Sequence, residues 1–387
     1  MDAVKLTQKL IQFDTVNPPG NERECGLFVA DILAQAGFEI ECQEFGDQHI
    51  NVIAKLPGGS SGHSPKGDFD DAPLVLTGHL DTVPLGDAPW SVAPWSGDIR
   101  GGKLYGRGAS DMKSGVAAMI VAGLAFAQTD KANRRRGLTL VFTSCEETGC
   151  QGALHLVQEG TIDLGEASAM IVGEPTENQF CTAHKGALFI RAHTQGVTAH
   201  SSMPDLGDNA IYKTAKAITK IENYGFNEAP HPFLGSPTIN VGMVKGGLNV
   251  NSVPDSAEFT IDIRTNAAKP HSAFFDDLDG YLGDDIKLET FTDMPAISTD
   301  LDDPFTRIVA GACQVVLKDS YQDIPTGLPF FTDASALHPH YQCPTIILGP
   351  GELSTMHQTD EYCLVERIEQ AVEIYGRVIN NWCLHEV

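Results

Sequence analysis

Apolar residues recur at helical spacing in the first half of the chain and alternate there with short apolar runs. Residues 25–37 (CGLFVADILAQAG) carry this spacing and end at a glycine, which predicts a helix with a glycine C-cap. A second, more apolar helix is expected over residues 113–128, and an amphipathic helix over residues 1–10. Strands are expected at 38–45, 51–56, 74–76, 138–142 and 170–172. This alternation predicts an α/β domain with a mixed central sheet flanked by helices.

The pattern changes near residue 183. Strands are expected at 187–194, 238–245 and 256–265, and a helix at 208–222. The alternation of helices and strands seen in the first half returns with a helix at 305–317, a strand at 346–348 and a helix at 365–380. We therefore predict an outer domain made of residues 1–182 and 293–387, interrupted by an α+β domain of residues 183–292.

The composition is that of an ordinary globular protein, with 42% hydrophobic and 20% charged residues among 387. The net charge of −25 argues against a nucleic-acid partner, because phosphates need clustered Lys and Arg. The one basic run, residues 131–136 (KANRRR), is predicted to be a solvated loop between a helix and a strand. Residues 58–72, rich in Gly, Ser and Asp, predict a surface loop.

Nothing in the chain predicts a membrane partner. The N-terminus lacks the basic and apolar regions of a signal peptide. The longest apolar stretch, residues 116–127, is shorter than a membrane span. Nine cysteines without a CxxC pair predict reduced thiols and a cytoplasmic protein.

Five acidic and imidazole side chains carry the strongest chemical signal: His79, Asp111, Glu147, Glu174 and His357. Their blocks are GHLDTVP (78–84), GRGASDMKSG (106–115), TSCEETG (143–149), VGEPT (172–176) and MHQTDEY (356–362). Four lie where a predicted strand meets a loop, and the fifth follows a Gly/Pro-rich turn. An α/β sheet gathers such strand ends along one edge. Two imidazoles and three carboxylates suit a pair of Zn²⁺-like ions if one carboxylate bridges, with positions left open for water and substrate.

Neighbouring residues suggest how the roles divide. Asp81 lies two positions after His79, so it can hydrogen-bond the imidazole nitrogen that faces away from a metal; the alternative is a carboxylate that caps a turn. Asp111 follows a Gly-rich turn that allows close approach, and we assign it the bridge. Glu146 and Glu147 are adjacent and must point differently, so one can bind metal while the other acts as general base. A solvated acidic pair is the alternative.

These blocks resemble the zinc amidohydrolases that include acetylornithine deacetylase, succinyl-diaminopimelate desuccinylase, aminoacylase and glutamate carboxypeptidase. The match extends over essentially the whole chain, from Asp14-Thr15 to the His357 block. The resemblance implies two Zn²⁺ ions, with Co²⁺ or Mn²⁺ as substitutes. One ion would bind His79, Asp111 and Glu174, and the other Asp111, Glu147 and His357. Glu146 would be the base, Asp81 would orient His79, and the peptide bond between Asp111 and Met112 would be cis.

The inserted domain carries two further likenesses. Residues 196–204 (GVTAHSSMP) resemble the stretch whose histidine, here His200, reaches the active site of the partner subunit and stabilises an oxyanion. Asn251 and Arg264 resemble residues that hold the substrate carboxylate, and a bidentate Arg contact suits that task. The resemblance implies a ferredoxin-like dimerisation and lid domain in a homodimer. A core or interface histidine at 200 and a structural ion pair at Arg264 are the alternatives.

The resemblance implies hydrolysis of the amide bond of an N-acyl amino acid or short peptide. Acetylornithine, a substrate of arginine biosynthesis, is the first expectation. Succinyl-diaminopimelate and carboxypeptidase or dipeptidase substrates are the alternatives. Cys145 departs from the family pattern, because relatives often have Asp or a small residue there; we expect it to pack in the core, with a third metal ligand as the alternative. Residues 332–335 (TDAS) also depart from the usual Gly-Thr-Asp form.

Overall fold

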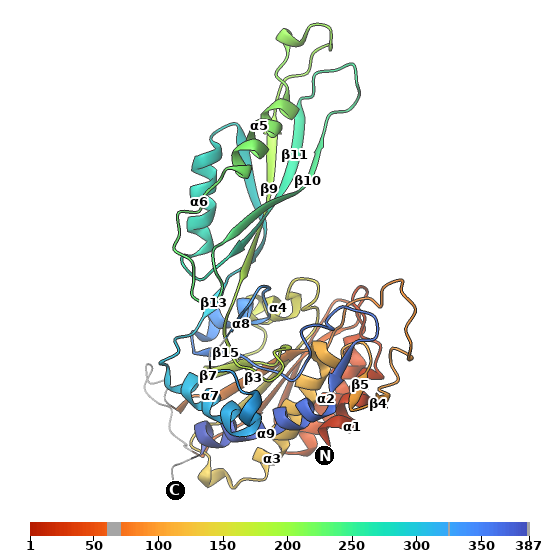
Figure 1. The fold of residues 1–387 in the computed structure, drawn as a ribbon, viewed down its shortest axis with the longest axis vertical. Helices are drawn as coiled ribbons and strands as arrows, with labels where there is room; N and C mark the ends of the chain where they lie inside the picture. Colours follow the sequence, from red (N-terminus) through yellow and green to blue (C-terminus); the bar gives the residue numbers. More distant parts are fainter. Residues whose placement is uncertain (60–70, 324–325, 385–387) are drawn as a thin grey trace. The chain divides into compact units, whose positions relative to one another are not determined.

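A computed structural model describes residues 1–59, 71–323 and 326–384 (Figure 1). The chain divides into two compact units. Unit 1 comprises Met1–Ala183, Ser298–Thr326 and Thr332–Val387, and unit 2 comprises His184–Ile297 and Gly327–Phe331. The sequence placed the boundaries at 182/183 and 292/293. Most of the loop expected at 58–72 lies outside the described residues.

Unit 1 is built on a large mixed sheet. Its strands are β1 (Glu39–Phe45), β2 (His49–Leu56), β3 (Leu74–His79), β6 (Leu138–Thr143), β7 (Ala169–Val172), β8 (Cys181–His184), β13 (Ile297–Ser298), β14 (Thr326–Leu328) and β15 (Thr345–Ile347). Their order is β1-β2-β6-β3-β7-β15-β8-β13, with β14 paired to β8. The central strands β6, β3, β7 and β15 are mutually parallel, whereas β2 runs antiparallel to β6 and β8 antiparallel to β15. A small second sheet joins β4 (Ile99–Arg100), β5 (Lys103–Tyr105) and β16 (Tyr362–Leu364).

The central strands are buried at every position because helices cover both faces of the sheet. All residues of β3, β6 and β7 are buried. The helices of unit 1 are α1 (Ala3–Ile11), α2 (Glu22–Gln35), α3 (Ser114–Ala127), α4 (Gln151–Glu159), α7 (Pro304–Leu317), α8 (Ala334–Tyr341) and α9 (Val365–Cys383), with short turns η2 (Ala109–Lys113), η3 (Lys131–Asn133) and η5 (Lys318–Ser320). The main core joins α2, α3, α7 and α9 to alternate residues of the strands.

One segment has the length and hydropathy of a membrane-spanning helix. It covers Ala109–Ala127, with a mean hydropathy of 1.2 over its most apolar window. However, 83% of that window is buried inside the protein, and α3 packs against α1 and α9. This is the composition of a core helix.

The basic run at residues 131–136 corrects one sequence expectation. Lys131–Asn133 are exposed as expected, but Arg134 and Arg136 are only 6% and 5% exposed, so these two arginines are not solvated. Arg134 donates from Nη2 to the carbonyl oxygens of Ala127 (2.9 Å) and Thr129 (2.6 Å), at the end of α3. The Arg136 guanidinium lies 4.3 Å from the Trp382 ring centroid. Both side chains bind carbonyl and aromatic groups at helix ends, where cations are favoured.

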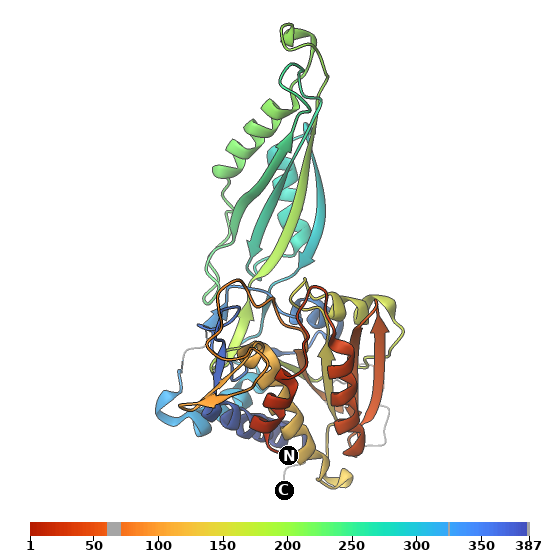
Figure 2. The same cartoon turned by 90° about the vertical axis from the view of Figure 1, so that its right-hand side faces the viewer.

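Unit 2 consists of a four-stranded antiparallel sheet and two helices, drawn in green and cyan in Figure 2. Its elements are β9 (Gly186–Gln195), η4 (Pro204–Leu206), α5 (Ala210–Glu222), β10 (Thr238–Gly246), β11 (Ser256–Thr265), α6 (His271–Leu282) and β12 (Ile286–Met294). The strand order β10-β11-β9-β12 and the β-α-β-β-α-β succession make it ferredoxin-like, as expected. Every second residue of β11 is buried, and both helices pack on this face.

Candidate metal centre

The carboxyl ends of the parallel strands of unit 1 bring the predicted side chains together. His79 is the last residue of β3, Glu146 and Glu147 lie in the turn after β6, and Glu174 follows β7. His357 comes from the loop after β15 and has a positive φ of 59°. Parallel strands end at one edge of a sheet, so residues distant in sequence meet there.

Asp111 lies at the centre of the group. Its Oδ1 is 3.1 Å from Nε2 of His79, and its Oδ2 is 3.3 Å from Nε2 of His357. Nε2 of His357 also lies 3.2 Å from Glu147 Oε2, and Nε2 of His79 lies 3.8 Å from Glu174 Oε1. The two oxygens of Asp111 therefore face two different imidazoles, an arrangement suited to a carboxylate shared between two ions.

Glu146 lies close to this group too. Ligand atoms of His79, Asp111 and Glu147 lie within 4.8 Å of one another, and so do those of His79, Glu146 and Glu174. The carboxylates of Glu146 and Glu147 face different parts of the site, as their adjacency predicted.

The side chains fit a pair of divalent cations. Glu147 Oε1 is buried and has no hydrogen-bond partner among the described residues. Burial and neighbouring carboxylates raise the pKa of Glu147 to about 7, and they raise those of Glu146 and Glu174 well above the usual value. Four acidic groups facing two imidazoles leave an excess of negative charge that cations would neutralise.

The imidazoles take up protons in the metal-free centre. Hydrogen bonds to Asp111 and Glu147 raise the pKa of His357 to about 10. Burial alone would raise the pKa of Asp111, but hydrogen bonds from His357 and His79 hold it below its usual range. These protons occupy ligand atoms that a metal needs, so metal binding would release them.

Asp81 links two blocks of the site. Its carboxylate accepts hydrogen bonds from the backbone N–H groups of Glu146 (3.1 Å) and Glu147 (3.2 Å), and from Asn17 Nδ2 (3.1 Å). Nδ1 of His79 lies 3.0 Å from the Asp81 carbonyl oxygen and 3.5 Å from its Oδ1. Asp81 thus lies behind His79, but the hydrogen bond to the imidazole comes from its main-chain carbonyl rather than from the carboxylate, which holds the turn that carries Glu146. The role of Asn17 was not predicted.

A second unpredicted residue, Glu361, holds the Asp111 turn. Its buried carboxylate accepts hydrogen bonds from the backbone N–H groups of Gly108 (3.0 Å), Ser110 (2.8 Å) and Asp111 (3.0 Å). Arg107 Nη1 lies 2.6 Å from it. The sequence could have pointed to Glu361, because it lies four residues after His357 in the same block, MHQTDEY (356–362). The peptide bond between Asp111 and Met112 is cis, as the resemblance implied.

Cys150 and Asp333 surround the carboxylate of Glu146. Cys150 Sγ lies 3.5 Å from Glu146 Oε1, and both residues group with Asp333. Asp333 is the residue immediately before α8, and Thr143 donates a hydrogen bond to its Oδ2. Burial raises the pKa of Asp333 to about 6. Residues 332–335 had drawn attention only as a departure from the family pattern.

In unit 2 the structure brings together two of the three predicted residues. The exposed His200 pairs in an isolated bridge with Ser252, and Ser201 N–H donates to the carbonyl oxygen of Asn251 (3.0 Å). His200 Nδ1 also lies 2.8 Å from Ser202 Oγ. His200 and Asn251 therefore lie on adjacent loops.

Arg264 lies at the other end of β11, a strand whose ten residues span about 30 Å. Its guanidinium pairs with Asp262, at 2.9 Å between Nε and Oδ1, and lies 5.1 Å from the Phe189 ring centroid. The ion pair named as the structural alternative is thus present, and the side chain stays half-buried rather than enclosed.

Comparisons with known proteins identify relatives over nearly the whole chain. The model of "Peptidase family M20/M25/M40" matches residues 75–381. A probable succinyl-diaminopimelate desuccinylase of Staphylococcus epidermidis is 29% identical, over 97% of this chain and 96% of the relative. An acetylornithine deacetylase of Myxococcus xanthus is 30% identical, over 91% and 90%.

Solved structures share the fold at lower identity. The aminopeptidase PepT of Bacillus cereus superposes with a TM-score of 0.74 at 21% identity, covering 98% of each chain. A dinuclear metal-binding peptidase of the M20 family from Bacillus subtilis gives a TM-score of 0.69 at 15% identity, over 97% of this chain and 96% of the other.

Proposed function

Because the chain belongs to peptidase family M20/M25/M40, we propose that it hydrolyses the amide bond of an N-acyl amino acid, acetylornithine first. The observation that carries this proposal is the convergence of His79, Asp111, Glu147, Glu174 and His357 on one sheet edge beside the buried Glu146. Relatives named as acetylornithine deacetylase and as succinyl-diaminopimelate desuccinylase support the same reaction on two substrates. The desuccinylase reaction is therefore the second candidate.

We assign one metal to His79, Asp111 and Glu174 and the other to Asp111, Glu147 and His357, with zinc as the first choice and cobalt or manganese as substitutes. Bound metals supply a Lewis acid for the scissile carbonyl and lower the pKa of a water. Asp111, with an oxygen toward each imidazole, would bridge them.

Glu146 is the general base in this proposal. Its carboxylate takes a proton from the attacking water and returns it to the leaving amine. Burial and the neighbouring Glu174 raise its pKa well above the usual carboxyl value, and this increases its affinity for the proton. Cys150 and Asp333 enclose Glu146, and the turn anchored on Asp81 fixes its backbone.

Unit 2 would complete the site by forming a homodimer and closing over substrate. The edge strand β10 is exposed along most of its length. Large apolar side chains on and near this strand are exposed to solvent: Leu206, Tyr212, Met243, Val244, Leu248 and Val250. A C₂ pair formed through this surface would bury them.

We assign His200 to the oxyanion, and Asn251 and Arg264 to the substrate carboxylate. Within one unit 2, β11 separates His200 and Asn251 from Arg264, so one chain does not bring the three together there. This separation supports the proposal that His200 and Asn251 serve the partner's site. The nine free cysteines agree with the cytoplasmic, reducing location that we propose.

A substrate panel tests the reaction. Purified enzyme loaded with Zn²⁺ would be assayed with N-acetylornithine, N-succinyl-diaminopimelate, other N-acyl amino acids and dipeptides. We expect the highest kcat/KM on N-acetylornithine. A clear preference for the succinyl substrate would favour the second candidate, and turnover of dipeptides alone would contradict both.

A further inference from the structure

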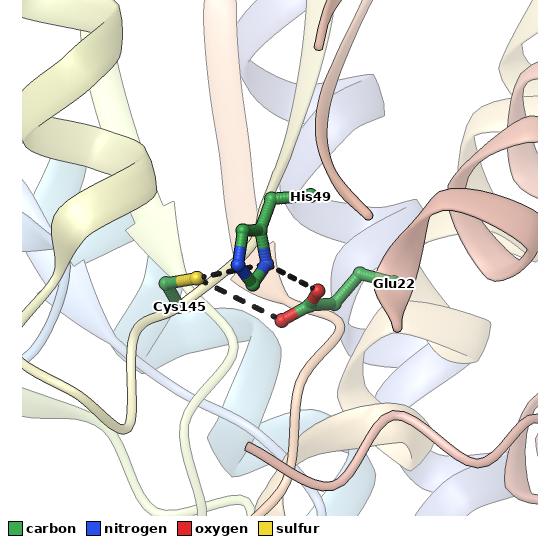
Figure 3. A group of neighbouring side chains, drawn as sticks. All are labelled: Glu22, His49 and Cys145. Atoms are coloured by element: carbon green, nitrogen blue, oxygen red, sulfur yellow. Dashed lines mark hydrogen bonds and ion pairs between the residues drawn. The ribbon is translucent and has the colours of Figure 1, made fainter. Parts of the chain in front are cut away.

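Glu22, His49 and Cys145 form a cluster of possible ligands outside the dinuclear centre (Figure 3). Glu22 is the first residue of α2, His49 is the first residue of β2, and Cys145 follows β6 with a positive φ of 58°. Three segments distant in sequence thus direct a carboxylate, an imidazole and a thiol toward one point. We call this group the Cys145 cluster.

Two side chains approach the same ring nitrogen. Nδ1 of His49 lies 2.7 Å from Glu22 Oε2 and 3.1 Å from Cys145 Sγ, and Sγ lies 3.9 Å from Glu22 Oε1. The side chains of Glu22 and His49 are 0% and 19% exposed, and Cys145 is 2% exposed. Nδ1 carries either one proton or one lone pair, so it cannot form a full hydrogen bond with both neighbours.

A glycine lets these side chains pack close to the backbone. A Cβ at Gly20 would lie 3.0 Å from both Nδ1 of His49 and Oε2 of Glu22, and 2.5 Å from His49 Cε1. Gly20 has a φ of +80°, and because it has no side chain the His49 ring and the Glu22 carboxylate can pack directly against its backbone. Phe45 stacks on the His49 ring at 5.3 Å between centroids, which fixes the ring's orientation.

We propose that the Cys145 cluster binds a third metal ion of the Zn²⁺ class, with Cys145 Sγ, His49 Nδ1 and the Glu22 carboxylate as ligands and water in the remaining position. Tetrahedral zinc places such ligand atoms about 3.3–3.7 Å apart, so the contact of 2.7 Å between His49 Nδ1 and Glu22 Oε2 must open by about 0.6 Å and that of 3.1 Å between Nδ1 and Cys145 Sγ by less. Binding releases the thiol proton to solvent, since the ligand is the thiolate. Cys145 is buried, as the expectation of core packing requires, and the proposal adds the alternative role of a metal ligand.

The sulfur ligand distinguishes this site from the dinuclear centre. The five residues assigned to the two catalytic ions are all imidazoles and carboxylates, whereas the Cys145 cluster includes a thiol, which favours softer ions. Cys145 also directly precedes Glu146 in the chain. A metal held there would join α2 and β2 to the turn that carries the general base.

Cobalt titration of the whole enzyme tests this proposal. Co²⁺ bound by thiolate has a near-ultraviolet charge-transfer band that imidazole and carboxylate sites lack. We expect this band in the wild type, and metal analysis should find three ions per chain. Cys145→Ser should remove the band and leave two ions, and His49→Gln should weaken binding at the same site.

Two cysteines provide matched controls. Cys150→Ser removes the thiol beside Glu146, and Cys42→Ser removes the exposed thiol; both variants should keep the band. Absence of the band in the saturated wild type would overturn the proposal even if no variant folds. So would its persistence in Cys145→Ser or its loss in Cys150→Ser. Failure of the dinuclear assignment gives a different result: the band remains while activity or the other two ions are missing.

Discussion

In unit 1, residues from five separate blocks meet at one place, whereas in unit 2 three predicted residues are divided between the two ends of a strand. The difference follows from strand direction. The parallel strands β6, β3 and β7 all end at the same edge, so the residues after them gather there. In the antiparallel sheet of unit 2, neighbouring strands deliver their ends to opposite edges.

Strand direction therefore determines whether a single chain brings all the residues of a proposed site together. Unit 1 supplies the proposed ligands and the base by itself. Unit 2 places His200 and Asn251 on adjacent loops and Arg264 about 30 Å along β11, by the rise of a strand. The proposed function accordingly takes the metal centre from one chain and the substrate-binding residues from two.

The largest effect is expected from removing the base. Glu146→Ala should lower kcat by roughly 10²–10⁴-fold or more while both catalytic metals stay bound, because the side chain moves a proton and is not a ligand. Metal analysis and steady-state kinetics measure the two quantities. Glu147→Ala is the matched control and should lose metal. Loss of metal from Glu146→Ala would make Glu146 a ligand and reverse the assignment.

The support of the Asp111 turn should matter for stability. Arg107→Ala leaves the buried Glu361 carboxylate without its cation, and breaking such a pair costs about 3–5 kcal/mol. Urea unfolding of the metal-free protein measures this loss. The exposed pair of Arg100 with Asp98 is the control, and Arg100→Ala should change stability by about 1 kcal/mol or less. Equal losses in the two variants would contradict this role of the pair.

A smaller effect is expected in unit 2. Arg264→Lys should lower kcat/KM by roughly tenfold, because a lysine cannot make the planar two-point contact with a carboxylate. Arg191→Lys is a matched control, since Arg191 also lies over a ring, 5.2 Å from the Phe291 centroid. If Arg264→Lys had unchanged kinetics on a carboxylate-bearing substrate, Arg264 would not bind the substrate, and its role would be limited to the ion pair with Asp262.

The smallest effect is a graded pH dependence of metal binding. In the metal-free centre the pKa of Glu147 is raised to about 7 and that of His357 to about 10, so both hold protons below these values. A metal must displace the protons, and its affinity should therefore rise as the pH increases through this range. Competition with a chelator at several pH values measures the slope, which His357→Gln should reduce. A metal affinity that does not change with pH would mean that Glu147 and His357 are not metal ligands.

Much of unit 1 could be predicted because its central strands are buried on both faces and begin as apolar runs. The strand expected at 138–142 is observed as Leu138–Thr143, and the helix expected at 113–128 as Ser114–Ala127. In unit 2, α6 and β12 were not predicted. The sequence of α6 (HSAFFDDLDGYL) is acidic and contains a glycine, and β12 is half-exposed with a register shift, so neither has a clear period.

In the candidate metal centre, too, the sequence predicted some residues and missed others. The proposed ligands could be found because each has its own motif, and the structure brings them together. Asn17 and Asp333 lie beside Asp81 and Glu146 only through tertiary packing, and Asn17 is 64 residues from Asp81 in sequence. Arg136 was wrongly expected in solvent because its partner, Trp382, is 246 residues away. Local patterns do not encode such pairs.

Subunit complementation tests the central comparison most directly. Inactive His200→Ala chains and inactive Glu146→Ala chains would be mixed, allowed to exchange, and assayed. If unit 2 serves the partner's metal centre, each heterodimer has one intact site, and equal mixing should restore about one quarter of wild-type activity. No recovery, with heterodimers demonstrated, would mean that His200 serves its own chain or takes no part in catalysis.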